Sequence, residues 1–373
     1  MRLLPLLAAI AALAAPLTPA LQLSAADPAT IIARHLEDGP VIQVALLLDD
    51  SGSMEGLINQ ARAQLWELVG LLGHATRDGK RARIEVALYH YGDLPFLDLP
   101  IVPLTSDLDL VSERLFTING GGGTEACGQV IHQALTQLAW RQDAQALRLI
   151  VIAGNEPFTQ GDFPWRSAVA SARAAGIAVH TIHCGPRADG VAGEWEAAAR
   201  AGGGTFTCID QDARTAIVAP QDDELGRLNL QLNGTYMAYG AAGAVAKERQ
   251  TMQDSNAASA GSLGSRVAAK SSGAYRNEGW DVVDAVRDGK LDLQAAKPTD
   301  LPAELRDKTP EERTATVVAK SAERARIQQQ IATLAAERSA WVAKQQPTAN
   351  TLGDGLKAAV QAQAAAAGFS VAQ

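Results

Sequence analysis

The chain has 373 residues, of which 47% are hydrophobic, and its formal net charge is −8. This length predicts two or three domains, and so much apolar material excludes wholesale disorder. An acidic chain offers no extended basic surface to displace counterions from phosphates, so we expect no nucleic-acid partner.

Residues 1–26 have the pattern of a secretory signal peptide. A positive start at Met1-Arg2 precedes an apolar run, Leu3–Leu17, and small residues follow up to Ala26. The run is short for a spanning helix, so an uncleaved membrane anchor is the weaker alternative. We therefore expect a periplasmic or secreted protein with no stable membrane span after cleavage.

Short apolar runs alternate with helical patterns between residues 41 and 209. Several of these runs are apolar on both faces, which indicates strands covered on both sides. The pattern predicts a doubly wound α/β domain over residues 27–218, with a mostly parallel sheet, helices on both faces and a ligand site at the carboxyl ends of the strands. Strands are expected at Val41–Leu48, Arg83–Tyr91, Leu97–Leu104, Leu147–Ile152, Ile177–Cys184 and Thr205–Ile209, and helices at Leu57–Leu72, Ser106–Arg114, Thr124–Trp140, Trp165–Ala175 and Val191–Ala201.

An α-helical C-terminal region is expected after residue 218, where Ala, Gln, Lys, Glu and Arg dominate. We divide it into a helical extension with a flexible segment, residues 219–290, and a helical hairpin, residues 291–373. Helix-capping patterns begin at Thr309 and Thr351. The first helix carries a coiled-coil-like seam, which packs on its own chain or, as the alternative, mediates oligomerisation. The seam consists of Ile327, Ile331, Leu334, Arg338 and Trp341.

A D-x-S-x-S motif, Asp49, Ser51 and Ser53, follows directly after the first strand. A hard divalent cation needs several oxygen ligands, and one carboxylate with two hydroxyls supplies part of that set. The alternative is a plain helix cap. An apolar strand running straight into this motif favours a metal site.

The segment from about residue 40 to 210 resembles the von Willebrand factor A domain and its metal-ion-dependent adhesion site. This stretch, which includes Ile152–Gln160 and His180–Gly185, resembles a bacterial subgroup of secreted A-domain proteins that has a helical C-terminal extension. The resemblance implies that Asp49, Ser51 and Ser53 hold Mg²⁺, or Mn²⁺ or Ca²⁺. It also implies a fourth ligand, Thr124, which follows four glycines.

The fifth position of the family pattern, an aspartate after a later strand, falls here on Gly154 or Asn155. We take Asn155 as the residue that orients a metal-bound water, with Asp50, Glu125 and Glu156 as accessory residues. The missing carboxylate implies a weaker resting affinity for the cation and a greater demand for an acidic ligand group.

The three cysteines predict one disulfide, Cys184 with Cys127 or Cys208, and the choice stays open. His180 and His183 are three apart on a strand and so face opposite sides, which favours structural roles. His90 is isolated in the sequence and receives the same interpretation.

The leading hypothesis is cation-dependent binding of a protein or other acidic ligand outside the cytoplasm. The alternative is a cell-envelope scaffold or assembly protein with a degenerate metal site and contacts through its helices. Removing the residues beyond about 290 would separate the two. We expect no enzymatic activity and no catalytic residue, because Ser53 in a nucleophile-like turn lacks the partners that a hydrolase needs.

Overall fold

The computed structural model describes residues 39–92, 101–121, 123–213, 217–345 and 351–371. The predicted signal peptide lies outside this part of the chain, as do residues 97–100 of the predicted strand at 97–104. Among the described helices, none is long and apolar enough to cross a membrane.

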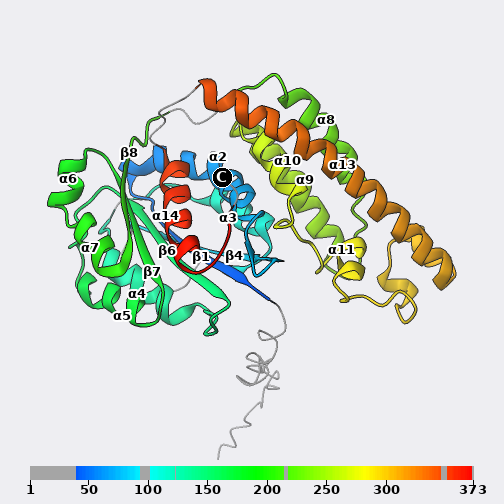
Figure 1. Cartoon of the computed structure of the whole chain (residues 1–373), viewed down its shortest axis with the longest axis horizontal. Helices are drawn as coiled ribbons and strands as arrows, with labels where there is room; N and C mark the ends of the chain where they lie inside the picture. Colours follow the sequence, from blue (N-terminus) through cyan, green and yellow to red (C-terminus); the bar gives the residue numbers. More distant parts are fainter. Residues whose placement is uncertain (1–38, 93–100, 122, 214–216, 346–350, 372–373) are drawn as a thin grey trace, which may run out of the picture. The chain divides into compact units, whose positions relative to one another are not determined.

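A six-stranded sheet forms the centre of the α/β domain, in the order β5-β4-β1-β6-β7-β8 (Figure 1). All neighbouring strands are parallel except β4 and β5, which pair antiparallel. The doubly wound, mostly parallel sheet predicted from the sequence is confirmed. The strands are β1 Val41–Asp49, β4 Arg83–Tyr91, β5 Val102–Thr105, β6 Ala146–Gly154, β7 Ala178–Cys184 and β8 Gly203–Ile209, and a separate hairpin pairs β2 Thr76–Arg77 with β3 Lys80–Arg81.

Helices cover both faces of this sheet, and successive side chains of β1 point alternately into the two cores that result. Ala45 and Leu47 belong to the core on one face, whereas Leu46 and Leu48 belong to the core on the other. The first face is covered by α4 Cys127–Gln137, α5 Trp165–Ala174 and α7 Trp195–Gly202, with the short α6 Arg187–Ala192 before α7, and the second by α2 Glu55–Leu72 and α3 Leu108–Thr117. The predicted helix at 191–201 is therefore two helices, because Glu194, in the left-handed region at φ 67°, breaks it.

The last helix of the described chain, α14 Leu352–Ala366, belongs to the α/β domain. It packs on α2, β6, β7 and β8, and Figure 1 shows it lying over the sheet. The predicted hairpin over residues 291–373 is therefore wrong. The apolar spacing of α14 predicts a buried face, but it does not identify the surface against which that face packs.

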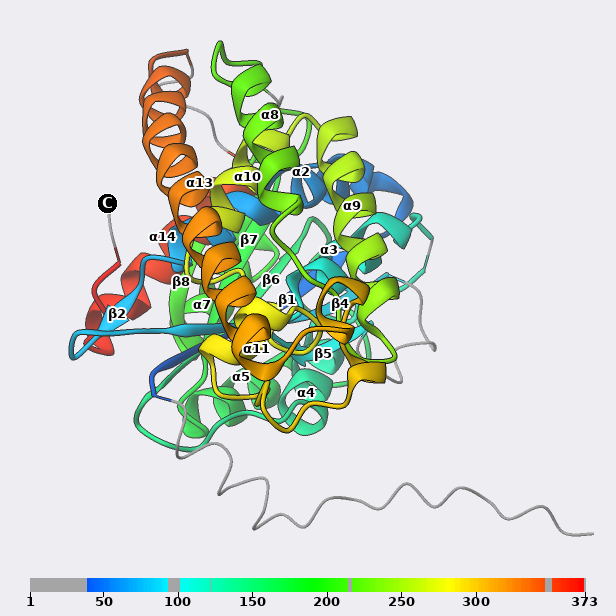
Figure 2. The same cartoon turned by 90° about the vertical axis from the view of Figure 1, so that its right-hand side faces the viewer.

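A helical unit, residues 222–345, lies in the sequence between β8 and α14. Its longest helix, α13, packs on α8, α10 and α11, and Figure 2 shows α13 in front of these helices. Ile327 and Ile331 of the predicted seam are fully buried, so this chain's own helices occupy the seam. The predicted boundary at residue 290 is absent, since α11 and α13 pack together. The helices are α8 Asp222–Asn233, α9 Gly243–Ser259, α10 Leu263–Ser271, α11 Val282–Arg287, α12 Ala303–Arg306 and α13 Pro310–Gln345.

Two of the predicted helix caps are present in the structure. Thr309 and Thr351 both make the predicted caps, each with its hydroxyl accepting from the amide three residues on. The cap of α3 is Asp107, one residue after the predicted start of this helix at Ser106. Within residues 219–290, where a flexible segment is predicted, α9 and α10 are joined by a tight turn, closed by the Ser262 amide donating to the Ala257 carbonyl at 2.8 Å.

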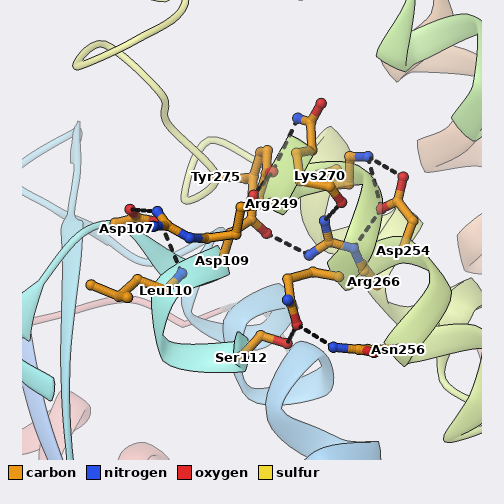
Figure 3. Close-up of polar contacts among 12 residues, drawn as sticks. Asp107, Asp109, Leu110, Ser112, Arg249, Asp254, Asn256, Arg266, Lys270 and Tyr275 are labelled. Carbon is orange, nitrogen blue, oxygen red and sulfur yellow. Dashed lines mark hydrogen bonds and ion pairs between the residues drawn. The ribbon is translucent and has the colours of Figure 1, made fainter. Parts of the chain in front are cut away.

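A buried charged network joins the helical unit to α3 (Figure 3). Arg266 of α10 donates to Asp109 of α3 at 2.7 Å and to Asp254 of α9 at 2.6 Å. Lys270 also donates to Asp254, and neither Arg266 nor Lys270 exposes any surface. Because buried charges require specific partners, this network fixes how α9 and α10 sit against α3.

Candidate metal centre

The loop after β1 gathers oxygen atoms at the carboxyl edge of the sheet. Asp49, the last residue of β1, is fully buried and accepts a hydrogen bond from the Ser51 amide at 2.9 Å. The hydroxyls of Ser51 and Ser53 lie 3.3 Å apart. Two oxygens that coordinate one Mg²⁺ side by side lie about 3 Å apart, since each Mg–O bond is about 2.1 Å. The loop therefore presents its two hydroxyls at a spacing suited to a small cation.

The glycine-rich segment runs alongside this loop. Gly121 forms a parallel bridge with Ser51, and its amide donates to the Asp50 carbonyl at 2.8 Å. A Cβ on Gly120 would lie 3.2 Å from that carbonyl, so the close approach favours glycine. Thr124 follows this segment, is exposed and lies three residues before α4 begins at Cys127. The structure thus brings the glycines that precede Thr124 to the loop.

The loop after β6 supplies Asn155. Its Nδ2 donates to the Ser53 hydroxyl at 3.2 Å. Gly154 can carry no side chain here, because a Cβ would lie 2.6 Å from the Tyr91 hydroxyl and 2.8 Å from Asp49 Oδ2. Of the two positions left open by the sequence, Asn155 is therefore the one that faces the loop.

Three buried oxygen atoms at this edge lack hydrogen-bond partners within the described part of the chain. They are Asp49 Oδ2, Asp50 Oδ1 and Asn155 Oδ1. An unpaired buried carboxylate oxygen is costly, and a cation compensates that cost directly. No group of three His, Cys, Asp or Glu side chains suited to a metal occurs among the described residues. This donor set therefore fits a cation held by one carboxylate and several hydroxyls, with Asp49, Ser51, Ser53 and Thr124 as the residues that would hold it.

Electrostatics at the site also favour a cation. The pKa of Asp49 is raised to about 7, chiefly by burial; the hydrogen bonds from Ser51 oppose the rise, and the charge of Glu125 adds to it. Burial likewise raises the pKa of Glu125, and the charge of Glu156 adds to that effect. Like charges crowded at one edge repel one another, and a divalent cation offsets this repulsion.

The accessory residues divide into two groups. Asp50 pairs with His90, with Asp50 Oδ2 and His90 Nδ1 2.5 Å apart. The interpretation of His90 as isolated is therefore wrong. Glu125 and Glu156 are instead connected through Gln160, a residue that the sequence did not single out. Its side-chain amide accepts from the Glu125 amide and donates to Glu156 Oε2, both at 3.2 Å.

The predicted disulfides are absent, and all three cysteines are free thiols. Cys127 lies in the core on the α4 face of the sheet, whereas Cys184 lies in the core on the α2 face. Cys208 pairs in register with His183, the neighbour of Cys184, so it points away from Cys184. The sheet separates Cys184 from both predicted partners.

The two strand histidines have structural roles, as predicted. His180 Nδ1 bonds the hydroxyl and the amide of Thr205, at 2.9 and 3.0 Å. His183 lies against the Trp195 ring on the opposite face, with ring centroids 5.7 Å apart.

The segment from β1 to β8 is a doubly wound α/β domain with D-x-S-x-S at the end of its first strand. Residues 43–212 match the family model of the von Willebrand factor type A domain. That segment is a von Willebrand factor type A domain, and domains of this family often hold a divalent metal at this motif. None of the curated proteins compared with the chain matches it.

Solved structures with a similar fold cover just under half of the chain. The proximal thread matrix protein 1 of the mussel byssus, solved with a zinc-occupied MIDAS motif, is 13% identical at a TM-score of 0.36, over 47% of this chain and 43% of its own. BatB from Bacteroides thetaiotaomicron is 18% identical at a TM-score of 0.34, and the match covers 45% of this chain and 90% of BatB. An aerotolerance-related membrane protein from Bacteroides fragilis is 19% identical at a TM-score of 0.32, and the match covers 46% of this chain and 93% of that protein. The chain thus spans less than half the length of the mussel protein.

Proposed function

We propose that this protein binds a divalent cation, Mg²⁺ or Mn²⁺, at Asp49, Ser51, Ser53 and Thr124. Through that cation it binds an acidic group of a protein ligand outside the cytoplasm. The signal-peptide pattern of residues 1–26 supports the location. No catalytic step is proposed, since the loop supplies hydroxyls and a carboxylate arranged for ligation.

The proposal rests on Asp49 Oδ2, which is buried and has no partner among the described residues, in the same loop as two hydroxyls 3.3 Å apart. Cation sites of this kind keep positions for water, and a carboxylate from a partner can take one of them. A ligand carboxylate would thus complete the coordination and neutralise the remaining positive charge.

Calorimetric titration of the full mature chain with Mg²⁺ and Mn²⁺ tests this proposal. Asp49→Asn keeps the size of the side chain and an oxygen for the Ser51 amide but removes the charge, so we expect binding to disappear. Asp78→Asn is the matched control, because Asp78 is exposed on the β2–β3 turn at φ 51°, a conformation that asparagine tolerates. Equal binding by Asp49→Asn and the wild type would refute the proposal.

The second candidate is an envelope scaffold whose metal site is degenerate. One observation favours it: Asn155 is neutral where the family pattern places an aspartate. In that case the wild type would show no binding at millimolar Mg²⁺ or Mn²⁺, and the helical unit, residues 222–345, would make the contacts.

A further inference from the structure

Gln160 connects the two loops that flank the metal centre. Its Oε1 accepts from the Glu125 amide in the turn before α4, and its Nε2 donates to Glu156 Oε2 in the loop after β6. Both bonds are 3.2 Å long and join parts of the chain that are 35 and 4 residues apart. One side chain thus fixes the spacing between the Thr124 segment and the Asn155 loop.

Two hydrogen bonds hold the backbone around Glu156. The Trp195 indole donates to the Glu156 carbonyl at 2.8 Å, and the Phe158 amide donates to the Gly193 carbonyl at 2.8 Å. Trp195 is fully buried, so this support is rigid. With its backbone anchored and one carboxylate oxygen engaged by Gln160, Glu156 has a defined position at the rim of the site.

The acidic rim adjoins the metal loop. Glu156 directly follows Asn155, whose Nδ2 donates to the Ser53 hydroxyl at 3.2 Å, and Asp49 Oδ2 in the metal loop is buried and without a partner within the described residues. Asn155, which touches Ser53 directly, contributes no charge. The negative charge of the β6 loop therefore lies one residue later than in the family pattern.

We propose that Glu156, positioned by Gln160, supplies the negative charge that the family pattern takes from an aspartate at position 155. This inference rests on the cation site of the proposed function. Glu156 acts on the cation through charge and bound water, and Gln160 is a positioning residue that acts through Glu156. Removing a residue that orients a metal site from outside its ligands typically lowers metal affinity about 10–100-fold.

The test is a Mn²⁺ and Mg²⁺ titration by calorimetry on full-length variants. We expect Glu156→Gln and Gln160→Ala each to weaken binding about tenfold or more. Glu304→Gln, in an exposed glutamate of α12, is the matched control and should bind like the wild type. Asn155→Asp should restore affinity in the Glu156→Gln and Gln160→Ala backgrounds and raise affinity less in the wild type.

Thermal unfolding without added metal separates charge from packing. Glu156→Gln removes a repulsive charge, so its melting temperature without metal should equal or exceed that of the wild type, while the increase produced by Mn²⁺ shrinks. A purely structural Glu156 would instead lower the melting temperature under both conditions, which would overturn the inference. Wild-type affinity in Glu156→Gln, with binding lost in Asp49→Asn, would overturn it and leave the proposed function standing. Absence of binding by the wild type itself would mark failure of the proposed function.

Discussion

Arg266 of α10 and Asp109 of α3 form a buried ion pair, 2.7 Å apart, across the junction between the helical unit and the α/β domain. The guanidinium also lies 4.4 Å from the centre of the Trp66 ring of α2. Tyr275 donates to the other oxygen of Asp109 at 2.5 Å. One side chain of the helical unit therefore contacts both α2 and α3 on this face of the sheet.

Arg266→Ala should lower the free energy of unfolding by about 3–5 kcal/mol, because it leaves Asp109 and Asp254 buried without their guanidinium. Urea denaturation followed by circular dichroism measures this change. Arg249→Ala is the matched control, since Arg249 joins α9 to α3 through the partly exposed carboxylates of Asp107 and Glu113. We expect it to cost at most about 1 kcal/mol. Equal effects of the two variants would contradict the assignment of Arg266 as the main polar link.

The stabilisation conferred by Mg²⁺ should increase with pH. Burial raises the pKa of Asp49 from 3.8 to about 7, so in the absence of metal the fold favours its protonated form. That favourable contribution is complete below the unfolded pKa and is lost as the pH rises from about 4 through about 7. A cation competes with the proton and stabilises the ionised form, so Mg²⁺ should raise the melting temperature more at pH 8 than at pH 6.

Scanning fluorimetry with and without Mg²⁺ at the two pH values measures this difference. Asp49→Asn has no ionisable group at this position, so its melting temperature should show no such pH-dependent response to Mg²⁺. An identical rise for the wild type at pH 6 and pH 8 would argue against Asp49 as a cation ligand.

The thiols should differ in reactivity. Burial raises the pKa of Cys127 and Cys184 far above the ordinary thiol value, whereas Cys208 is only partly buried. Since the thiolate is the reactive form, a maleimide should label Cys208 first in the folded protein and all three cysteines after denaturation. Mass spectrometry locates the label. Formation of a disulfide at Cys184 on mild oxidation of the folded protein would contradict the separation of these thiols by the sheet.

Leu356→Ala should destabilise the α/β domain by about 2–5 kcal/mol, as expected for a leucine truncated in a packed core. Leu356 of α14 is 3% exposed and contacts the core on the α2 face of the sheet. Val318→Ala, on the exposed side of α13 at 62% exposure, is the control and should change stability by less than about 0.5 kcal/mol. Urea unfolding of both variants measures the difference, and equal effects would mean that α14 is dispensable for the sheet.

This packing also changes how the two candidate functions can be separated. Removing the residues beyond about 290 takes away α14 together with α12 and α13, so loss of metal-dependent binding would then report an unfolded domain. Substitutions at Asp49 or Glu156, which keep the whole chain, are the better comparison.

Most of the α/β fold could be predicted because its signals are local. The apolar run of β1 leads directly into Asp49, Ser51 and Ser53, and the alternation of strands and helices defines the parallel sheet. Thr124 and Asn155 could be placed because each follows its own strand or precedes its own helix. Local pattern and tertiary structure agree at these positions.

The parts of the fold and of the candidate site that could not be predicted depend on contacts between residues far apart in the sequence. Leu352 donates its amide to Gln60, 292 residues away, and this contact places α14 on α2. Gln160 meets the Glu125 amide across 35 residues, and a glutamine in a loop carries no local signal for such a role. Both alternatives for the predicted disulfide failed for a related reason, because the spacing of cysteines in the sequence does not show on which side of a sheet each thiol lies.

The position of α14 after the helical unit affects how the protein is made. A nascent chain presents all six strands before the helix that covers part of their α2 face, and the whole of residues 210–351 must be synthesised in between. Until then, Leu46, Leu48 and Val151 lack the cover of Leu352 and Leu356, beside which they lie in the finished fold. Exposed apolar strands promote aggregation of incomplete chains. Chaperone protection during synthesis therefore matters until α14 has emerged.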